Sequence, residues 1–296
     1  MRIKMNRNLI LVLGGLFVMP AFAESVDKTM DAARDGHVDI YNTAGSIKVT
    51  GWSRDSVQVT GELGDDVEEL VFERDGDNIL IKVKVPRNHG RDIDSDIVVR
   101  VPAGSSIDVS GVSADIDVDG VSGQESLSTV SGDVNAEDVS ASIEAESVSG
   151  DVDVIGTGAS IDVSTSTVSG DVFVSGLSGE IDAESVSGDV DIEGGSFDRA
   201  YFETVNGDLT FIAGLNKGGR LSAESVNGDV EIMFTNDVSA SFDIETFNGD
   251  IDACFGPKPE RTSRYAPGLE LSFTQGDGDG RVSVETLNGD VTICQQ

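Results

Sequence analysis

The stretch SIEAESVSGDVDV, residues 142–154, is one copy of a pattern that runs through most of this 296-residue chain. Its central phrase recurs eight times, as TVSGDV, SVSGDV, TVSGDV, SVSGDV, TVNGDL, SVNGDV, TFNGDI and TLNGDV. The glycines of these copies are Gly132, Gly150, Gly170, Gly188, Gly207, Gly228, Gly249 and Gly289, spaced by 18, 20, 18, 19, 21, 21 and 40 residues. A unit of about 20 residues is too small to bury an apolar face alone, so neighbouring units must stack. The sequence therefore predicts an all-β solenoid, or β-helix, of stacked two-strand repeats.

The alternation inside one copy predicts which side chains face the core. Ile143 and Ala145 fall on one face of a short strand. The parity then changes, and the positions expected to face inward are Val148, Gly150, Val152 and Val154, with their counterparts Val186, Gly188, Val190 and Ile192. A change of parity between two short strands means that the chain turns a corner with its apolar side still inward.

A run of hairpins is the alternative local structure. Asn-Gly between alternating strands is a strong hairpin signal, and the last four copies carry it. Hairpins in series would form a meander, a barrel or a propeller. However, Ser replaces Asn in the first four copies without disturbing the spacing, and a propeller blade needs about 40 residues. The spacing favours the solenoid.

The N-terminus has the pattern of an export signal over residues 1–23. A basic start is followed by an apolar stretch at 9–19 and by Ala21-Phe22-Ala23, a small-x-small cleavage pattern. The apolar stretch is shorter than a membrane span requires, and a retained N-terminal anchor is the competing interpretation. We expect residues 24–105 to form the first rungs or a cap, and 106–296 to form the solenoid, with an insertion at 255–280, as one domain.

The chain is strongly acidic. Its net charge is −34, and removal of the three positive charges of the signal gives −37 for the mature protein. Phosphate binding requires a basic surface, so the charge rules against nucleic acid as a partner and argues against adsorption on anionic lipid. A strongly negative surface instead favours solubility and attracts cations or basic partners.

The phrase also predicts columns of equivalent residues. We expect the glycines to line one edge, where a neighbouring backbone comes too close for a Cβ, and the Ser and Asn before them to hydrogen-bond turn amides. Stacked carboxylates about 4.8 Å apart repel by about 1 kcal/mol. Turn amides, screening salt or weakly bound Ca²⁺ or Mg²⁺ must offset this repulsion. The aspartates of this column are Asp133, Asp151, Asp171, Asp189, Asp208, Asp229, Asp250 and Asp290.

The two cysteines occupy the same position of the repeat. Cys254 follows Gly249 by five residues, and Cys294 follows Gly289 by five residues. If the insertion between them loops out, they lie on adjacent rungs, at a Cα separation that a disulfide allows. An exported chain meets an oxidising compartment. We therefore expect a Cys254–Cys294 disulfide that fastens the final rung.

The insertion after Cys254 interrupts the repeat. Its cationic and aromatic residues make it the best candidate for partner contact, although an insertion that is merely tolerated is the alternative. These residues are Lys258, Arg261, Arg264 and Tyr265. The Gly/Asp run at 276–280 occurs once and lacks a following apolar register, so a flexible acidic loop is favoured over a calcium site.

Catalysis has little support in the sequence. The two histidines, His37 and His89, have no metal-ligand spacing, and no nucleophile motif is present. Acidic pairs abound because of the repeat, so they say little about glycoside chemistry. The sequence predicts a protein that is not an enzyme and has no cofactor beyond weakly bound cations.

The sequence resembles the bacterial putative-adhesin family of secreted β-solenoids, whose biochemistry is undefined. The resemblance rests on GSIKVTGWSRDSVQV at 45–59, IVVRVPAGSSIDVSGVSADIDV at 97–118 and the repeated SVSGDVDV and SVNGDVEI units. It implies an exported, repetitive, non-catalytic fold. We expect a binding or scaffolding module of the cell envelope, in the periplasm or at the cell surface, with a protein or glycan partner. The alternatives are a surface adhesin and a polysaccharide-active enzyme, and end-to-end self-association is open.

Overall fold

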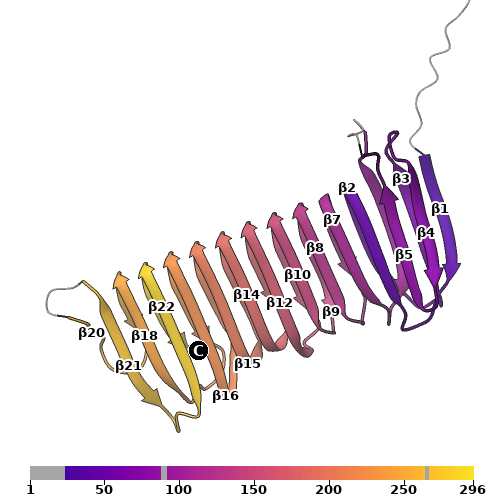
Figure 1. Cartoon of the computed structure of the whole chain (residues 1–296). Helices are drawn as coiled ribbons and strands as arrows, with labels where there is room; N and C mark the ends of the chain where they lie inside the picture. The colour runs from indigo at the N-terminus through magenta and orange to yellow at the C-terminus, as the bar shows by residue number, and fades with distance from the viewer. Residues whose placement is uncertain (1–23, 88–91, 264–266) are drawn as a thin grey trace, which may run out of the picture.

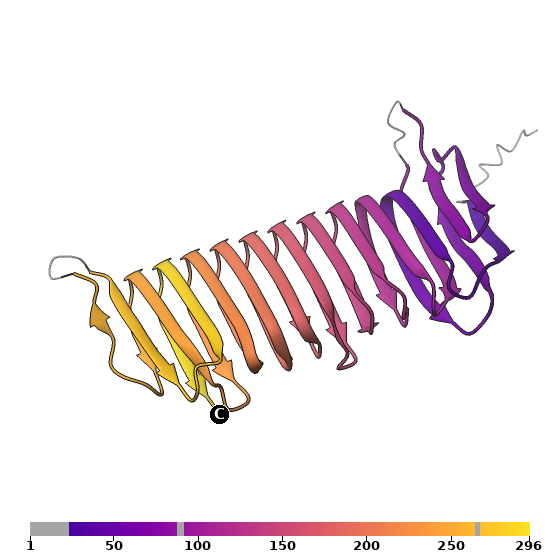
Figure 2. The ribbon, with the colours of Figure 1, turned by 60° about the horizontal axis from the view of Figure 1, so that its bottom comes forward.

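The computed structural model describes residues 24–87, 92–263 and 267–296. These residues form 23 strands in one mixed, hydrogen-bonded sheet that winds into a long stack (Figures 1 and 2). The expected signal at 1–23 lies outside the described residues. Within the described part of the chain, no helix has the length and apolarity of a membrane span. The expectation of an all-β, solenoid-like protein is confirmed.

The strands of the repeats form two parallel rows, one on each side of the stack. Row A, before each turn of the phrase, holds β8 (Glu125–Ser131), β10 (Ile143–Ser149), β12 (Ser160–Ser169), β14 (Ser178–Ser187), the second halves of β15 (Val190–Asn206) and β16 (Leu209–Asn227), β22 (Gly280–Asn288) and β18 (Ala240–Asn248). Row B, after each turn, holds β9 (Val134–Val139), β11 (Val152–Gly156), β13 (Val172–Ser175), the first halves of β15 and β16, β17 (Val230–Phe234), β23 (Val291–Gln295) and β19 (Ile251–Ala253). Equivalent residues lie side by side; Ser149, for example, pairs with Ser131 and Ser169.

The core lies between the two rows. In the strands of the two rows, buried residues largely alternate with outward-facing ones, so small β-branched side chains such as Val152, Val172 and Val190 form a column with one residue per strand. Toward the C-terminus aromatic side chains also meet across the core: Phe211 of row B stacks on Phe202 of row A, with ring centroids 5.7 Å apart. Burial of these continuous columns stabilises the stack, because a single repeat has no core of its own.

The parity expected for Val148 and Val186 is wrong. Their exposed fractions are 45% and 43%, whereas the preceding Ser147 and Ser185 are buried. The hydroxyl Oγ of Ser147 donates to the carbonyl oxygen of Gly132, 3.0 Å away. The inward alternation of row A therefore ends on the Ser or Thr that opens the phrase, and the corner falls at the following three residues.

The N-terminal strands do not follow chain order. They are β1 (Glu24–Asp31), β2 (His37–Trp52), β3 (Ser56–Leu63), β4 (Glu69–Asp75), β5 (Asn78–Lys84), β6 (Ser95–Pro102) and β7 (Ser106–Asp119). The two halves of β2 lie between β7 on one side and β5 and β6 on the other. β4 pairs antiparallel with β5, and β3 pairs antiparallel with β1 and β6. The outer strands at this end are thus β1 and β4. The boundary expected after residue 105 stays a prediction.

The C-terminal strands are also out of order. β22 and β23 lie between β16 and β17 on one side and β18 and β19 on the other. Figure 1 shows the yellow β22 among orange strands that precede it in the chain. Beyond β18, β21 (Leu269–Gln275) adds an antiparallel strand, and the short β20 (Glu260–Arg261) pairs with β21. The last segment of the chain is therefore an internal rung of the stack.

Candidate functional site

An exposed apolar column follows row A at its corner. It consists of the second residue of each phrase together with Val112, the equivalent residue of β7, and we call it the apolar ladder. In spatial order its members are Val112, Val130, Val148, Val168, Val186, Val205, Val226, Leu287 and Phe247. All but the half-buried Val205 are 38–49% exposed. Large apolar side chains arranged in one continuous line mark a binding surface rather than scattered surface exposure.

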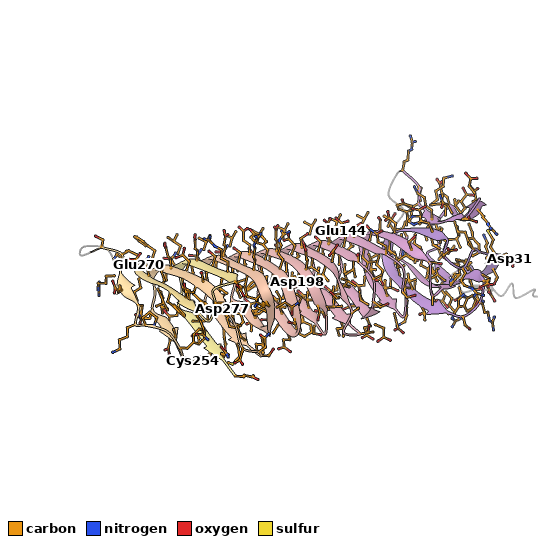
Figure 3. All side chains as sticks on the ribbon, turned by 90° about the horizontal axis from the view of Figure 1, so that it is seen from below. Asp31, Glu144, Asp198, Cys254, Glu270 and Asp277 are labelled. Carbon is orange, nitrogen blue, oxygen red and sulfur yellow. A yellow bond between two sulfur atoms is a disulfide. The ribbon has the colours of Figure 1, made fainter. Side chains whose placement is uncertain are left out.

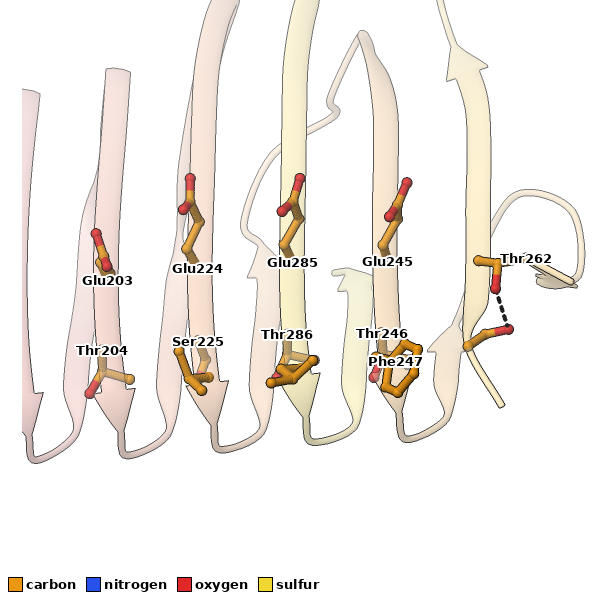
Figure 4. A pocket seen from close by; sticks show the side chains of 13 residues that line it. Glu203, Thr204, Glu224, Ser225, Glu245, Thr246, Phe247, Thr262, Glu285 and Thr286 are labelled. Atoms are coloured by element: carbon orange, nitrogen blue, oxygen red, sulfur yellow. Dashed lines mark hydrogen bonds between the residues drawn. The ribbon is translucent and has the colours of Figure 1, made fainter. Parts of the chain in front are cut away.

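A column of carboxylates runs parallel to the apolar ladder, two residues earlier on the same outer side of row A. We call it the acidic ladder. Its members are Glu146, Glu184, Glu203, Glu224, Glu285 and Glu245, with Ser166 between the first two. Figure 4 shows four of them in one row above a row of Thr and Ser side chains. The two ladders lie about 7 Å apart, because alternate residues of a strand share one face.

The space between the two ladders is a groove. One hollow of about 280 Å³ is bordered by Glu203, Glu245 and Phe247, and a second of about 410 Å³ by Val148, Glu184 and Glu203. Both hollows reach Glu203, so they follow one another along the stack. Buried Ser and Thr lie below them, and each of these donates to a backbone carbonyl; Thr204 Oγ1, for example, lies 3.0 Å from the oxygen of Gly188. The groove therefore has one apolar wall and one acidic wall. Its floor consists of Ser and Thr side chains whose hydroxyl groups already donate hydrogen bonds to the backbone.

The acidic ladder carries uncompensated charge. Among the described residues, no Lys or Arg nitrogen lies within 4.0 Å of its six carboxylates. Partial burial, reinforced by Asp182 and Glu203, raises the pKa of Glu184. Partial burial and the charge of Glu285 likewise raise the pKa of Glu245. A cation placed over this row would favour the charged carboxylates and so oppose both the burial and the like-charge repulsion that raise these pKa values.

The hydroxyl of Tyr201 adds a polar contact at the centre of the ladder. It donates to Glu203 Oε2 at 2.5 Å, and this hydrogen bond raises the pKa of Tyr201. Ser222 makes a longer contact of 3.4 Å with Glu224 Oε1. Two carboxylates of the acidic ladder, those of Glu203 and Glu224, are thus hydrogen-bonded by neutral hydroxyl groups.

The insertion closes the C-terminal end of the groove. Thr262 and Gly268 line its last hollow, and Thr262 Oγ1 donates to the carbonyl oxygen of Gly268 at 3.2 Å (Figure 4). Phe273 on β21 stacks on Phe242 with ring centroids 4.6 Å apart, and Leu271 is buried. The insertion therefore does not simply loop out, because part of it caps the open end of the core.

The predicted contact residues of the insertion are only partly placed. Lys258 and Arg261 are exposed near this end, whereas Arg264 and Tyr265 lie outside the described residues. Their role as a contact site stays a prediction.

The aspartate column is a structural ladder. The carboxylate of each member accepts the backbone amide of the next Asp along the stack: Asp151 Oδ1 lies 2.9 Å from the nitrogen of Asp171, and Asp208 Oδ1 lies 2.8 Å from that of Asp229. The series begins one rung earlier than predicted, at Asp115, and ends with the amide of Asp250 bonded to Asp290. No group of three or more His, Cys, Asp or Glu suited to a metal occurs among the described residues. The amides offset the repulsion, and the cation hypothesis stays a prediction.

The glycines and asparagines of the phrase complete this corner. A Cβ at Gly150 would overlap the carbonyl oxygen of Gly132, which is the close approach expected. The asparagines form a ladder, but their partners are one another rather than turn amides: Asn227 Nδ2 donates to Asn206 Oδ1 at 3.0 Å. The turn amides are already bonded to the aspartates, which explains the difference.

The structure joins Cys254 and Cys294 in a disulfide with a Cα separation of 5.0 Å. It connects the ends of β19 and β23, which are adjacent in row B as the register predicts. However, the outermost rung that it fastens is β18–β19, and the last segment of the chain lies inside it. Figure 3 shows Cys254 on the underside near the C-terminal end.

The other candidate positions do not form a site. His37 contacts Ser106 Oγ at 3.0 Å and Asp39 at 3.4 Å, and His89 lies outside the described residues. The Gly/Asp run forms the turn between β21 and β22, where Asp279 pairs with Lys217 at 3.1 Å. The groove was not predicted from the sequence. The pattern that could have indicated it is the apolar second residue of every phrase.

Comparisons with known proteins place the chain in a family without assigning a ligand. No curated protein is significantly similar to it. Two similar solved structures come from Parabacteroides distasonis: a putative adhesin (11% identity, 93% of this chain, 98% of that chain, TM-score 0.43) and a putative lipid binding protein (12% identity, 92% and 96%, TM-score 0.44). A putative adhesin from Bacteroides fragilis is 14% identical over 92% of this chain and 97% of its own, with a TM-score of 0.35. Likeness at this level supports no inference about what this chain binds. Residues 37–294 match the family model, and the chain therefore belongs to the Toastrack DUF4097 family.

Proposed function

We propose that this protein is an exported, non-catalytic binding module of the bacterial cell envelope, and that it binds an elongated partner in the groove between the apolar and acidic ladders. The observation that carries the proposal is the uncompensated acidic ladder beside a continuous exposed apolar ladder. Apolar exposure and like-charge repulsion both cost free energy in the unbound protein, and a partner removes both costs.

In this proposal each repeat of about 20 residues supplies one rung of the binding surface, with one apolar position and, except where Ser128 and Ser166 replace Glu, one acidic position. In the same proposal, residues 24–105 cap the N-terminal end of the stack. The rigid, disulfide-fastened stack presents the row without a conformational change, which lowers the entropic cost of binding. The −37 charge of the expected mature chain keeps identical stacks apart and steers basic partners toward the surface.

Site-specific photo-crosslinking in intact cells tests the proposal. A crosslinking residue is placed at Val168 in the groove and, as a matched control, at Glu231 on the outer side of row B. We expect discrete adducts from position 168 and none from 231. Equal adduct patterns from both positions would remove the groove from the proposed function.

Protease treatment of intact cells separates the proposed envelope role from that of a surface adhesin. Loss of this chain while a periplasmic control survives favours the adhesin. Full protection until the cells are permeabilised favours a periplasmic component. The remaining alternative, a polysaccharide-active enzyme, requires loss of hydrolysis on Asp→Asn changes outside the repeated phrase.

A further inference from the structure

We infer that the occupant of the groove is a basic amphipathic α-helix that lies along the stack, with its cations over the acidic ladder and its apolar stripe on the apolar ladder. The inference rests on the proposed function, because it uses the same groove and specifies the chemistry of the partner. It goes beyond that function by fixing the charge, the secondary structure and the length of what binds.

Charge selects a basic partner. Glu203, Glu224 and Glu285 occupy successive strands, and no Lys or Arg nitrogen among the described residues reaches any of them. The neighbouring column does have a cation, because Arg199 lies 3.8 Å from Glu180 and 3.7 Å from Asp182. The carboxylates of the acidic ladder thus lack ion pairs, whereas Glu180 and Asp182 beside it are paired with Arg199. A row of Lys or Arg is the complementary ligand.

The apolar wall selects an amphipathic partner over a simple polycation. Val168 and Val186 are 46% and 43% exposed, and Phe247 and Leu287 at the far end are 49% and 47% exposed. A chain of cations alone would cover the acidic wall and leave these side chains in water. A partner with an apolar stripe beside its cationic stripe buries them as well.

The spacing selects a helix. Each wall offers one side chain per strand, about 4.8 Å apart. An α-helix presents a residue on a given stripe once per turn of about 5.4 Å, so the mismatch is about 0.6 Å per turn and flexible Lys side chains absorb it. Same-side residues of an extended strand recur at about 6.7 Å, and those of a polyproline helix at about 9.3 Å. The strand spacing falls out of step with the ladders within a few rungs. The polyproline spacing matches only every second rung, at about 9.6 Å, and leaves the Glu and the apolar residue of each rung between without a partner.

The length of the row sets the length of the helix. From Glu146 to Glu245 the acidic ladder crosses seven strands of row A, counting Ser166. Six spacings of about 4.8 Å give about 29 Å, which matches a helix of about 20 residues. Thr262 and Gly268 limit the groove at its C-terminal end.

The test uses the full mature chain and synthetic peptides of 20 residues as probes. The first peptide places Lys once per helical turn beside a Leu stripe; the second has the same composition in strict alternation; the third keeps the Lys but replaces Leu with Gln. We expect saturable binding of the first peptide, and binding weaker by at least about tenfold, or about 1.4 kcal/mol, for the other two. A gain of helical circular dichroism on binding identifies the bound peptide as a helix.

Charge-matched variants locate the site. Glu203→Gln, Glu224→Gln and Glu285→Gln together should weaken the first peptide about tenfold, since each exposed ion pair contributes only modestly and three are lost. Asp191→Asn, Glu231→Gln and Asp252→Asn remove the same charge from row B and should change affinity less than about twofold. Val168→Ser with Val186→Ser should weaken the first peptide but not the Gln-containing one.

Equal binding of all three peptides, or equal losses from the two charge triplets, would overturn the helix and leave only diffuse attraction to an acidic surface. If the peptides fail while crosslinks from position 168 persist in cells, the groove binds a partner of other chemistry. In that case the proposed function stands and this inference falls. If both fail, the proposed function falls as well.

Discussion

Two columns of carboxylates run along the same stack at the same spacing, yet they differ in how their charge is met. In the aspartate column each carboxylate accepts an amide from the next turn, as Asp208 does from Asp229 at 2.8 Å. In the acidic ladder no Lys or Arg nitrogen of the described residues lies within 4.0 Å of the carboxylates of Glu224 and Glu285, which form one row (Figure 4). The carboxylates of the aspartate column are hydrogen-bonded within the fold, whereas those of the acidic ladder remain available to a partner. A repeated acid is therefore informative about function only once its partners are known.

The largest expected effect concerns a third kind of carboxylate, Glu125. It takes the place of an apolar residue between Ile107 and Ile143, is 1% exposed, and neither of its oxygens has a hydrogen-bond partner. Burial raises the pKa of Glu125 to about 8. The folded state therefore holds this proton more tightly than the unfolded state, and the side chain costs stability increasingly as the pH rises from about 4.5 toward 8.

Glu125→Leu should accordingly raise the free energy of unfolding at pH 7 by on the order of 3 kcal/mol. The gain should shrink as the pH falls toward 4, because the native carboxyl is then neutral in both states. Urea unfolding at pH 4, 7 and 8 measures this difference. Glu144→Leu on the exposed side of the next strand is the control, and an equal gain there would show that the burial argument is wrong.

Removal of one member of the aspartate column should destabilise the protein. Asp208→Ala leaves the amide of Asp229 without its acceptor and should cost about 1.5 kcal/mol, as expected for a hydrogen bond to a charged group. Glu224→Ala removes a carboxylate that accepts only a long bond from Ser222 and should stay within about 0.5 kcal/mol. Chemical unfolding of the two variants compares the columns directly. Equal losses would abolish the distinction between them.

Neutralising the acidic ladder should stabilise the unbound protein slightly. Glu203→Gln, Glu224→Gln and Glu285→Gln together relieve neighbouring repulsions of at most about 1 kcal/mol each before screening, so we expect a net gain of about 0.5 kcal/mol. The gain should vanish at high salt. Thermal unfolding at low and high ionic strength measures it. A loss of stability would mean that the hydrogen bonds from Tyr201 and Ser222 to these carboxylates outweigh the repulsion.

The smallest expected effect is that of divalent cations on the aspartate column. A site with a Kd in the millimolar range stabilises the protein by only about 0.4 kcal/mol when the free Ca²⁺ concentration equals that Kd. The melting temperature should therefore rise slightly between chelator and millimolar Ca²⁺ at equal ionic strength. Asp208→Asn should reduce the rise. An unchanged melting temperature would leave the turn amides as the sole compensation.

The sequence predicted the elements that depend on local pattern. The interval between phrases predicts the stacking, and the equal offsets of Cys254 and Cys294 from their glycines predict the disulfide that the structure contains. The close approach behind Gly150 followed from the same spacing. The orientation of Val148 did not follow, because the alternation of Val152 and Val154 was extended back through the corner, whereas the inward alternation of row A continues to Ser147. The hydroxyl of Ser147, which bonds the backbone inside the corner, decides that orientation.

The sequence by itself determined that this chain builds parallel columns of equivalent residues, because side-chain alternation and repeat length fix the register of each copy. Only the tertiary structure decided which copies are neighbours. Asn288 pairs with Asn227 on one side and Asn248 on the other, although the order along the chain is 227, 248, 288. All copies present nearly the same backbone edge and the same repeated side chains, so the free energy of pairing any two copies is nearly equal. Packing at the ends of the stack therefore decides which copies become neighbours. There, Phe242 meets Phe255 and Phe273 of the insertion, which covers β18 and leaves the last segment inside the stack.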